Sequence, residues 1–445
     1  MARLRLCATV MVAAMLSSAC GSNSTPQQGG SAPSVGSSST GSESGTAGAH
    51  RFDGVTLNVA AESDQYAAVM QKLAGDFKAA TGATVNVDIL GYPEEYSKIT
   101  ADFVGHTANY DLVAMDIVWS GEFAANDYTV DLKPLIDRDA KQINLGDFYD
   151  VDWTLGGWKG KQVAFPMAGY AMLLNYNKPA FDAAGLQAPK TMDELKADAQ
   201  KLTNPAKNVY GITVNGQKGA AGAQDWMTYN SQMGGKLIDA DGKPTINSPT
   251  NVQNLAFFKS LFQFAPPGAF DYDWNAREQS FKQGIAMMQV GASIARPNYD
   301  DPSQSKIVGK VGTTIVPAGK GMQPVTGFEG WGLGINKDSK KQDAAWEYIK
   351  WLTSEKVQKK WIELGAGAYI RKSTLRDPEL LAKYPWQKMI DQAFQNGNGD
   401  FRPRVPQYSQ IQDILGTSVN EVLHGTTSAQ QALDQAQTQI EPLFK

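Results

Sequence analysis

Short apolar segments alternate with helical patterns in the part of the chain that follows a Ser/Gly-rich beginning. Residues 55–61 and 83–90 have the period of two that is typical of strands, and residues 111–116 form a third short apolar segment. Between the first two, residues 66–81 place apolar side chains four apart, as on one face of a helix that ends at Gly82. This alternation favours an α/β fold in which helices cover both faces of a parallel sheet.

The same alternation continues to the C-terminus. We expect further strands at residues 163–166, 171–177, 210–214, 286–289, 311–316 and 331–336. We expect helices at residues 94–104, 191–202, 224–233, 252–264, 275–282, 341–352, 385–395, 408–424 and 427–440. The spacings of Thr191 with Glu194 and of Thr427 with Gln430 predict capping boxes. Roughly 390 residues follow the Ser/Gly-rich N-terminal segment. A single hydrophobic core rarely supports so many residues, so we predict two lobes.

The N-terminus has the pattern of an export signal. Two arginines precede an apolar stretch at residues 6–16, which is shorter than the roughly 20 residues that a membrane-spanning helix needs. Small residues then lead to Cys20, which resembles a bacterial lipobox, although Ser17 stands where that motif usually has Leu; an ordinary signal peptide is the alternative. We predict a signal peptide at residues 1–19, then a lipidated Cys20 and a flexible linker at residues 20–51 that tether the protein to a membrane.

The composition argues against several other classes of protein. Of the two Cys, Cys7 falls in the predicted signal peptide, so we expect neither a disulfide nor a thiol nucleophile in the mature chain. The three His form no catalytic or metal-ligand pattern, and no P-loop sequence is present. The net charge is −4 with no long basic run, so we expect no nucleic-acid partner. We therefore predict no cofactor, no metal and no enzymatic activity.

Several segments resemble, in the same order, the sugar-binding proteins of bacterial ABC importers, the maltose-binding protein group. These segments are residues 111–132 (DLVAMDIVWSGEFAANDYTVDL), 272–287, 327–353, 365–379 and 402–408, together with the final helices. The resemblance implies an α/β, two-lobed fold of the periplasmic-binding-protein type II, in which each lobe is a sheet flanked by helices and hinge crossovers join the lobes. It places lobe 1 at residues 52–167 plus 314–372, and lobe 2 at residues 168–313 plus 373–445.

The resemblance also implies a function. We expect an extracytoplasmic lipoprotein, anchored to the cell membrane and monomeric, that captures a carbohydrate or polyol between its lobes and delivers it to the permease subunits of an ABC importer. A secreted carbohydrate hydrolase is an alternative, and it would need two carboxylates about 5–10 Å apart. A surface lectin that is not coupled to transport is another alternative.

Candidate binding residues follow from the chemistry of a sugar or polyol. Hydroxyl groups and an apolar C–H face require carboxylates, amides, guanidinium groups and aromatic rings. Asp116 ends a predicted strand and Trp119 follows it, so we expect both at the ligand, although Asp116 could instead cap a helix. Phe328, Glu329 and Trp331 precede a late strand beside glycines that permit close approach of the backbone; a packed loop is the alternative.

Four more candidates come from the resemblance. Glu62 lies where the sugar-binding proteins have their first binding loop. Tyr170 and Trp226 lie at or near positions where those proteins place aromatic contacts to ligand, although packing between lobes or in the core explains each as well. Arg371 lies in a returning loop near an arginine with which disaccharide-binding relatives hold hydroxyl groups.

The last three candidates follow from position along the chain. Ser293 and Arg296 come after a predicted strand, where a hydroxyl and a guanidinium would reach the cleft. Arg296 could equally pair with a surface carboxylate. Tyr408 is a late aromatic residue that we expect to flank the cleft.

Overall fold

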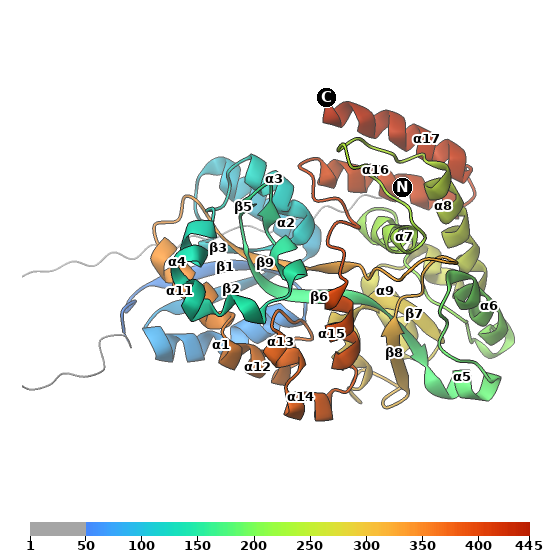
Figure 1. Cartoon of the computed structure of the whole chain (residues 1–445), viewed down its shortest axis with the longest axis horizontal. Helices are drawn as coiled ribbons and strands as arrows, with labels where there is room; N and C mark the ends of the chain where they lie inside the picture. The colour runs from blue at the N-terminus through green and yellow to red at the C-terminus, as the bar shows by residue number, and fades with distance from the viewer. Residues whose placement is uncertain (1–49) are drawn as a thin grey trace, which may run out of the picture. The chain divides into compact units, whose positions relative to one another are not determined.

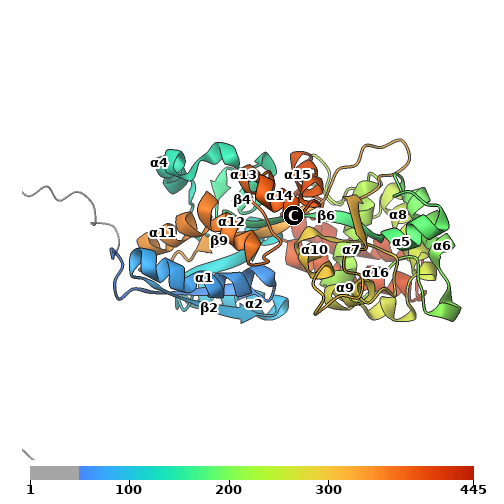
Figure 2. The same ribbon diagram turned by 90° about the horizontal axis from the view of Figure 1, so that it is seen from below.

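The long strand β6 (Phe165–Asn177) belongs to two groups of strands at once. The computed structural model describes residues 50–445; the predicted signal peptide, the lipidation of Cys20 and nearly all of the linker lie outside these residues. The first half of β6, through Ala171, pairs with β9 (Phe328–Ile335). The second half pairs with β7 (Met288–Ala292) and β8 (Val311–Ile315). One continuous strand therefore connects the group that contains α1 and α2 with the group that contains α5 and α6 (Figure 2).

The other elements are short and numerous. The remaining strands are β1 (Thr56–Glu62), β2 (Thr84–Leu90), β3 (Leu112–Asp116), β4 (Gly157–Trp158) and β5 (Lys161–Gln162). The helices are α1 (Gln65–Thr81), α2 (Tyr92–Gly105), α3 (Ser120–Ala125), α4 (Lys133–Ile143), α5 (Lys178–Ala184), α6 (Met192–Leu202), α7 (Ala220–Gln232), α8 (Pro249–Leu261), α9 (Trp274–Lys282), α10 (Arg296–Tyr299), α11 (Gln342–Leu352), α12 (Glu355–Glu363), α13 (Lys372–Leu375), α14 (Pro378–Lys383), α15 (Gln387–Gln395), α16 (Tyr408–Leu423) and α17 (Ala429–Ile440). Short 3₁₀ helices occur at Ile117–Trp119, Leu145–Asp147, Asp150–Thr154, Pro205–Lys207, Phe262–Phe264, Pro267–Asp271, Ser293–Ala295 and Glu441–Phe444.

The first strand group is a mixed sheet in the order β2-β1-β3-β9-β6. β1 pairs in parallel with β2 and β3, as the strand–helix alternation predicts. β9 runs antiparallel to both β3 and β6, so the prediction of a parallel sheet is wrong for these strands. The physical reason is the route of the chain: β9 enters from the second strand group and not through a βαβ crossover, and such a crossover is what makes neighbouring strands parallel.

Helices cover both faces of this sheet. α1 and α12 lie on one side, and α2 and α3 lie on the other (Figure 1). The ring centroids of Tyr66 in α1 and Trp361 in α12 are 6.4 Å apart, and those of Phe103 in α2 and Phe123 in α3 are 5.3 Å apart. Gly82 caps α1 with φ 86°, in the left-handed region that glycine adopts without strain.

The second strand group holds β7 and β8 against the end of β6. The predicted strand at residues 210–214 does not form there. Tyr210 makes an isolated bridge to Ala286, just before β7, and Thr213 makes one to Gln289 of β7, while the N–H of Ile212 donates to the carbonyl of Phe264. A parallel ladder forms hydrogen bonds at every second residue, and these two bridges lie three residues apart, so no regular ladder forms.

The capping predictions have different outcomes. The box of Thr191 and Glu194 is confirmed, because each side chain accepts a hydrogen bond from the other residue's backbone N–H. The second box lies one residue later than predicted, since Ser428 caps α17 with Gln431.

The buried apolar residues form one connected cluster that runs through both strand groups, with a small satellite around Phe281 and Tyr299. The cluster is continuous because β6 and β9 pass through its middle. Among residues 50–445, no helix combines the length and the apolar content that a membrane crossing requires.

Candidate ligand-binding site

A cavity of about 170 Å³ lies where two parallel strands end. Glu62 is the last residue of β1 and Asp116 is the last residue of β3, and both line the cavity. Ligands of open α/β sheets bind beyond the carboxyl ends of strands, so this is the expected position for a site. The middle of β6 and the start of β9 form a second wall, and α7, α9 and the residues after β7 form the opposite wall. Of the predicted site residues, those that line the cavity are Glu62, Asp116, Tyr170, Glu329 and Trp331.

Arg402 holds two of these carboxylates. Its Nη1 and Nη2 donate to Oδ2 and Oδ1 of Asp116 over 3.1 and 3.0 Å, and its Nε lies 3.4 Å from Oε1 of Glu329. All three side chains are buried. The hydroxyl of Tyr92 donates a further hydrogen bond of 2.9 Å to Asp116. Such a bidentate pair fixes the carboxylate while leaving oxygen lone pairs for a ligand hydroxyl.

A chain of hydrogen bonds connects α9 to β9. Nε1 of Trp274 donates to Oε1 of Gln224 over 2.7 Å, and Nε2 of Gln224 donates to both carboxylate oxygens of Glu329 over 2.7 and 2.6 Å. Burial raises the pKa of Glu329, and Arg402 opposes that shift. Residues from distant parts of the chain therefore orient one acceptor group at the cavity wall.

The carboxyl groups of Glu62 and Asp64 lack the guanidinium partner that Asp116 and Glu329 have within residues 50–445. Burial raises the pKa of Glu62 to about 9, with added repulsion from Asp64 and Asp116. Burial also raises the pKa of Asp64 to about 6, although its carboxylate accepts the N–H of Gln65 at the start of α1 over 2.7 Å. At neutral pH Glu62 is therefore a neutral carboxyl group that both donates and accepts hydrogen bonds.

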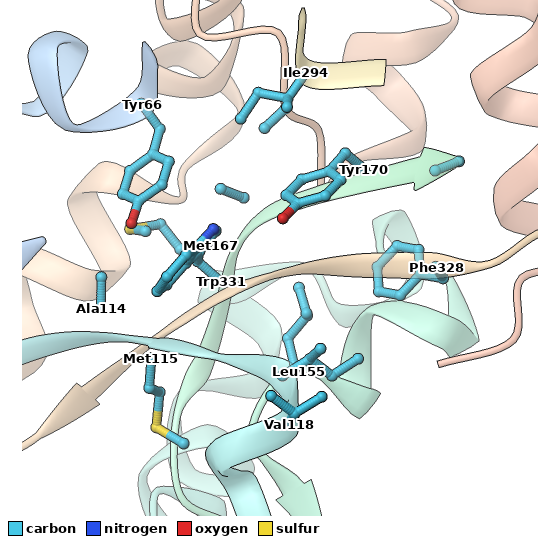
Figure 3. Packing of buried hydrophobic residues seen from close by; sticks show 14 of the residues in the cluster. Tyr66, Ala114, Met115, Val118, Leu155, Met167, Tyr170, Ile294, Phe328 and Trp331 are labelled. Carbon is cyan, nitrogen blue, oxygen red and sulfur yellow. The ribbon is translucent and has the colours of Figure 1, made fainter. Parts of the chain in front are cut away.

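Aromatic rings back the cavity. The centroid of the Trp331 ring is 5.7 Å from that of Tyr66 and 5.6 Å from that of Trp119. Trp119 does not line the cavity but supports Trp331 from behind. Among residues 50–445 the buried indole N–H of Trp331 has no hydrogen-bond partner, and Figure 3 shows the Trp331 ring next to that of Tyr66. A ligand hydroxyl is a partner that would satisfy this donor.

Three predicted aromatic contacts lie elsewhere. Trp226 on α7 is fully buried in the core. The ring of Phe328 packs against Phe394 at 5.0 Å between centroids. Tyr408 is buried at the start of α16, outside the cavity lining. The structure does not bring these rings to the cavity because their neighbours already cover them.

Three predicted polar contacts also lie outside the cavity. The hydroxyl of Ser293 accepts the N–H of Ala171 over 3.2 Å. Arg296 donates to the carboxylate of Asp300 over 2.6 Å and to the hydroxyl of Thr313 over 3.0 Å. The ion pair with Asp300 is the alternative that we gave for Arg296, a pair with a surface carboxylate. The guanidinium of Arg371 is shared between Asp147 and the carbonyls of Thr353 and Ile143, so its donors are used within the fold.

The sequence prediction missed Arg402, Tyr92, Gln224 and Trp274. A signal for Arg402 was present, because two predicted carboxylates at one site need a cation, and Arg402 lies in a segment (RPRVPQY) that resembles the sugar-binding proteins. No comparable pattern marked Tyr92, Gln224 or Trp274.

A larger groove of about 1150 Å³ lies beside the β4–β5 hairpin and the end of α7. Trp158, Lys236 and Arg404 are among the residues that line it. None of the predicted site residues lines this groove, and it shares no lining residue with the smaller cavity. The buried carboxylates and the free indole donor therefore favour the smaller cavity as the candidate site.

Comparison with known proteins identifies the family. The family of bacterial extracellular solute-binding proteins matches residues 60–359. The chain belongs to this family. A solute-binding protein of an ABC transporter from Agrobacterium radiobacter K84, solved in complex with ribitol, is 51% identical with a TM-score of 0.85, over 88% of this chain and 99% of that chain. This likeness confirms the two-lobed, periplasmic-binding-protein-like fold.

Curated relatives in the family are more distant. A probable amino-acid ABC transporter periplasmic-binding protein of Sinorhizobium fredii is 28% identical over 88% of this chain and 90% of the relative. The erythritol/L-threitol-binding protein of Mycolicibacterium smegmatis is 25% identical over 71% of this chain and 70% of the relative. The predicted role as a solute-binding component of an ABC transporter is confirmed by these family members.

Proposed function

We propose that the chain captures a small uncharged polyol in the cavity between β1, β3, β6 and β9 and delivers it intact to the permease subunits of an ABC importer. In this proposal the mature protein is a monomer, anchored through lipidated Cys20 at the extracytoplasmic face of the cell membrane. Lobe 1 comprises residues 52–167 plus 314–372, lobe 2 comprises residues 168–313 plus 373–445, and the lobes close over the solute.

One observation carries this proposal. Asp116 and Glu329 are buried acceptors held by one guanidinium, beside an indole donor of Trp331 that has no partner. A polyhydroxylated solute carries hydroxyl groups on adjacent carbons, and each hydroxyl both donates and accepts hydrogen bonds. Such a solute can therefore donate to Asp116 and Glu329 and accept from Trp331. The ribitol complex of the Agrobacterium relative supports the same class of ligand.

The size of the cavity limits the ligand. A volume of about 170 Å³ is below the roughly 300–1,000 Å³ of pockets that take drug-sized molecules. A solute of four to six carbons is therefore favoured over a disaccharide. An amino acid, as in the name of the Sinorhizobium relative, is disfavoured because its carboxylate needs a cation, and Arg277 and Arg402 already pair with Asp225 and Asp116.

The arrangement favours binding over hydrolysis. A glycosidase needs one carboxyl group as acid and a second as nucleophile or base, each facing the scissile bond. Here Arg402 donates both of its hydrogen bonds to Asp116 and Gln224 donates to Glu329, so both carboxylates act as acceptors for protein groups. We therefore propose that the protein is not an enzyme.

Thermal unfolding with added solutes tests the proposal. Ribitol, erythritol and mannitol are compared with maltose, each at the same concentration. A ligand at 100 times its Kd stabilises the fold by about 2.7 kcal/mol, which corresponds to a rise of about 3 °C in Tm for a chain of this size. We expect such a rise with at least one polyol and none with maltose. No rise with any polyol, or an equal rise with maltose, contradicts the proposal.

A matched pair of variants locates the site. Trp331→Phe removes the free indole donor from the cavity, and Trp158→Phe makes the same change in the larger groove. Loss of one hydrogen bond corresponds to about 0.5–1.5 kcal/mol, so the Kd for the polyol should rise about two- to thirteenfold in Trp331→Phe. Trp158→Phe should bind as the natural protein does. Equal effects of the two changes would place the site elsewhere.

A further inference from the structure

The cavity carries more acidic than basic groups. Five carboxyl groups and two guanidinium groups line it, so a fully ionised lining would have an excess of three negative charges. The basic groups are Arg277 and Arg402, and the acidic groups are Glu62, Asp64, Asp116, Glu278 and Glu329. With a neutral polyol, only protonation of a carboxyl group such as Glu62 reduces this excess of negative charge. A positive group on the ligand would correct part of it.

All but one of these carboxyl groups have protein donors. Arg402 donates to Asp116, Gln224 donates to Glu329, and the N–H of Gln65 at the start of α1 donates to Asp64. Glu278 accepts from the Tyr299 hydroxyl over 2.5 Å and from Gln289 over 3.0 Å, and Nη2 of Arg277 lies 3.5 Å away. The carboxyl group of Glu62 has no hydrogen bond and no ion pair among the contacts of residues 50–445.

The surroundings of Glu62 contain acids from three elements. Asp64 at the start of α1, Asp116 at the end of β3 and Glu95 on α2 all repel a negative charge there. Glu95 is fully buried, and neither of its carboxyl oxygens has a hydrogen-bond partner within residues 50–445. The hydroxyl of Tyr66 accepts the backbone N–H of Glu62 over 3.1 Å and forms no hydrogen bond with a carboxyl group of residues 50–445. Among residues 50–445, Arg402 pairs with Asp116, but no basic side chain forms an ion pair with Glu62, Asp64 or Glu95.

We infer that the end of the cavity at Glu62 is a subsite for a protonated amine, so that the preferred solute is a polyol in which an ammonium group replaces one terminal hydroxyl. This inference rests on the proposed function and specifies its ligand. An ammonium group is compact, carries three donors and forms charge-assisted hydrogen bonds with carboxylates. The partner-free indole of Trp331 and the acceptors Asp116 and Glu329 remain available for the hydroxyl groups along the rest of the solute.

Binding of such a solute is coupled to a proton. In the empty site burial raises the pKa of Glu62 to about 9, so its carboxyl group is protonated at pH 7.5. An adjacent ammonium group favours the ionised form, and the carboxyl proton passes to the solvent as the ion pair forms. The amine itself enters already protonated. Each binding event therefore releases up to one proton, whereas a neutral polyol leaves the proton on Glu62.

The test compares three five-carbon probes with the mature chain by isothermal titration calorimetry. Ribitol is neutral, 1-amino-1-deoxyribitol carries an ammonium group, and ribonate carries a carboxylate. A hydrogen bond to a charged group contributes about 1.5–3 kcal/mol, so the amine should bind at least about tenfold more tightly than ribitol. Ribonate should bind at least about tenfold more weakly than ribitol because it adds a like charge to the acidic wall.

Two further measurements assign the preference to Glu62. In buffers of different ionisation enthalpy, the heat of amine binding should show release of up to one proton, and the heat of ribitol binding should not. Glu62→Gln should reduce the ratio of amine to ribitol affinity at least fivefold. Glu122→Gln removes a half-buried carboxyl group that binds Tyr96 outside the cavity, and it should keep the natural ratio.

The outcomes separate the two proposals. Ribitol binding that equals or exceeds amine binding, with no proton release by the natural protein, overturns the amine subsite and leaves the proposed polyol function intact. Tight binding of ribonate overturns the subsite as well. Failure of all three probes, together with other polyols, overturns the proposed function and the inference with it. The proton measurement on the natural protein decides the matter even if Glu62→Gln does not fold.

Discussion

Replacement of Arg402 by Met should destabilise the fold far more than replacement of a surface arginine. Arg402 is 3% exposed, and its two partners, Asp116 and Glu329, are 3% and 0% exposed. Removing one member of a buried ion pair costs about 3–5 kcal/mol because the remaining charge is uncompensated. With a urea slope of about 3–4 kcal/mol/M for a chain of this length, the midpoint should fall by about 1 M at pH 8.

The pH dependence of this loss follows from the sign of one shift. Burial raises the pKa of Glu329, and Arg402 opposes the rise, so the variant should raise it further. A carboxyl group whose pKa is raised on folding destabilises the folded state above its unfolded pKa, and protonation at low pH removes the penalty. The deficit of Arg402→Met should therefore shrink between pH 8 and pH 5.

Urea unfolding followed by circular dichroism at both pH values measures the effect. Arg51→Met is the control, because Arg51 and its partner Asp343 are 61% and 88% exposed and lie 4.0 Å apart, so its midpoint should equal that of the natural protein. A midpoint for Arg402→Met within about 0.3 M of the control at pH 8, or a deficit that grows toward pH 5, would refute the reasoning.

Three further predictions concern single positions. Glu62→Gln should raise Tm at pH 8 but not at pH 4, because the folded protein holds a proton on Glu62 that the unfolded chain releases above about pH 4.5, and stability falls as pH rises toward 9; thermal melts at both pH values check this. Gly330→Ala should cost about 2–4 kcal/mol, because Gly330 has φ 145° and a Cβ there would overlap the carbonyl of Ala168, whereas Gly75→Ala on α1 meets open space and should stabilise by about 0.5–1 kcal/mol; urea midpoints distinguish them. Cys20→Ser should move the protein from the membrane fraction to the soluble fraction of fractionated cells, and a variant that stays in the membrane contradicts the lipid anchor.

The acidic residues of the site are predictable from sequence because of where they stand. Glu62 and Asp116 each end a short apolar strand, and parallel strands bring their carboxyl ends to one edge. The local pattern of apolar residues is enough to predict where these two strands end, and the rest of the chain is not needed. Local signals also predict the capping box at Thr191, which depends on only four consecutive residues.

The basic partner of these acids is not predictable in the same way. Arg402 lies 286 residues from Asp116, and Arg296 and Arg371 are equally plausible in the sequence. Which arginine reaches the carboxylates depends on the path of the chain between α15 and α16, and no local pattern encodes that path. The antiparallel direction of β9 is not predictable for the same reason. β9 enters from the second strand group, so no βαβ unit constrains its direction.

The shared strand β6 has a mechanical consequence. Tyr170 lies two residues before the point where the partner of β6 changes, since Ala171 still pairs with Phe328 of β9, whereas Met172 pairs with Ala292 of β7. Any rotation of one strand group against the other must twist the backbone at this pivot, because both ends of β6 are fixed by ladders. The phenol ring of Tyr170, which lines the cavity, lies beside this pivot. A bound solute and a rotation between the two strand groups would therefore both act directly on Tyr170, without other side chains in between.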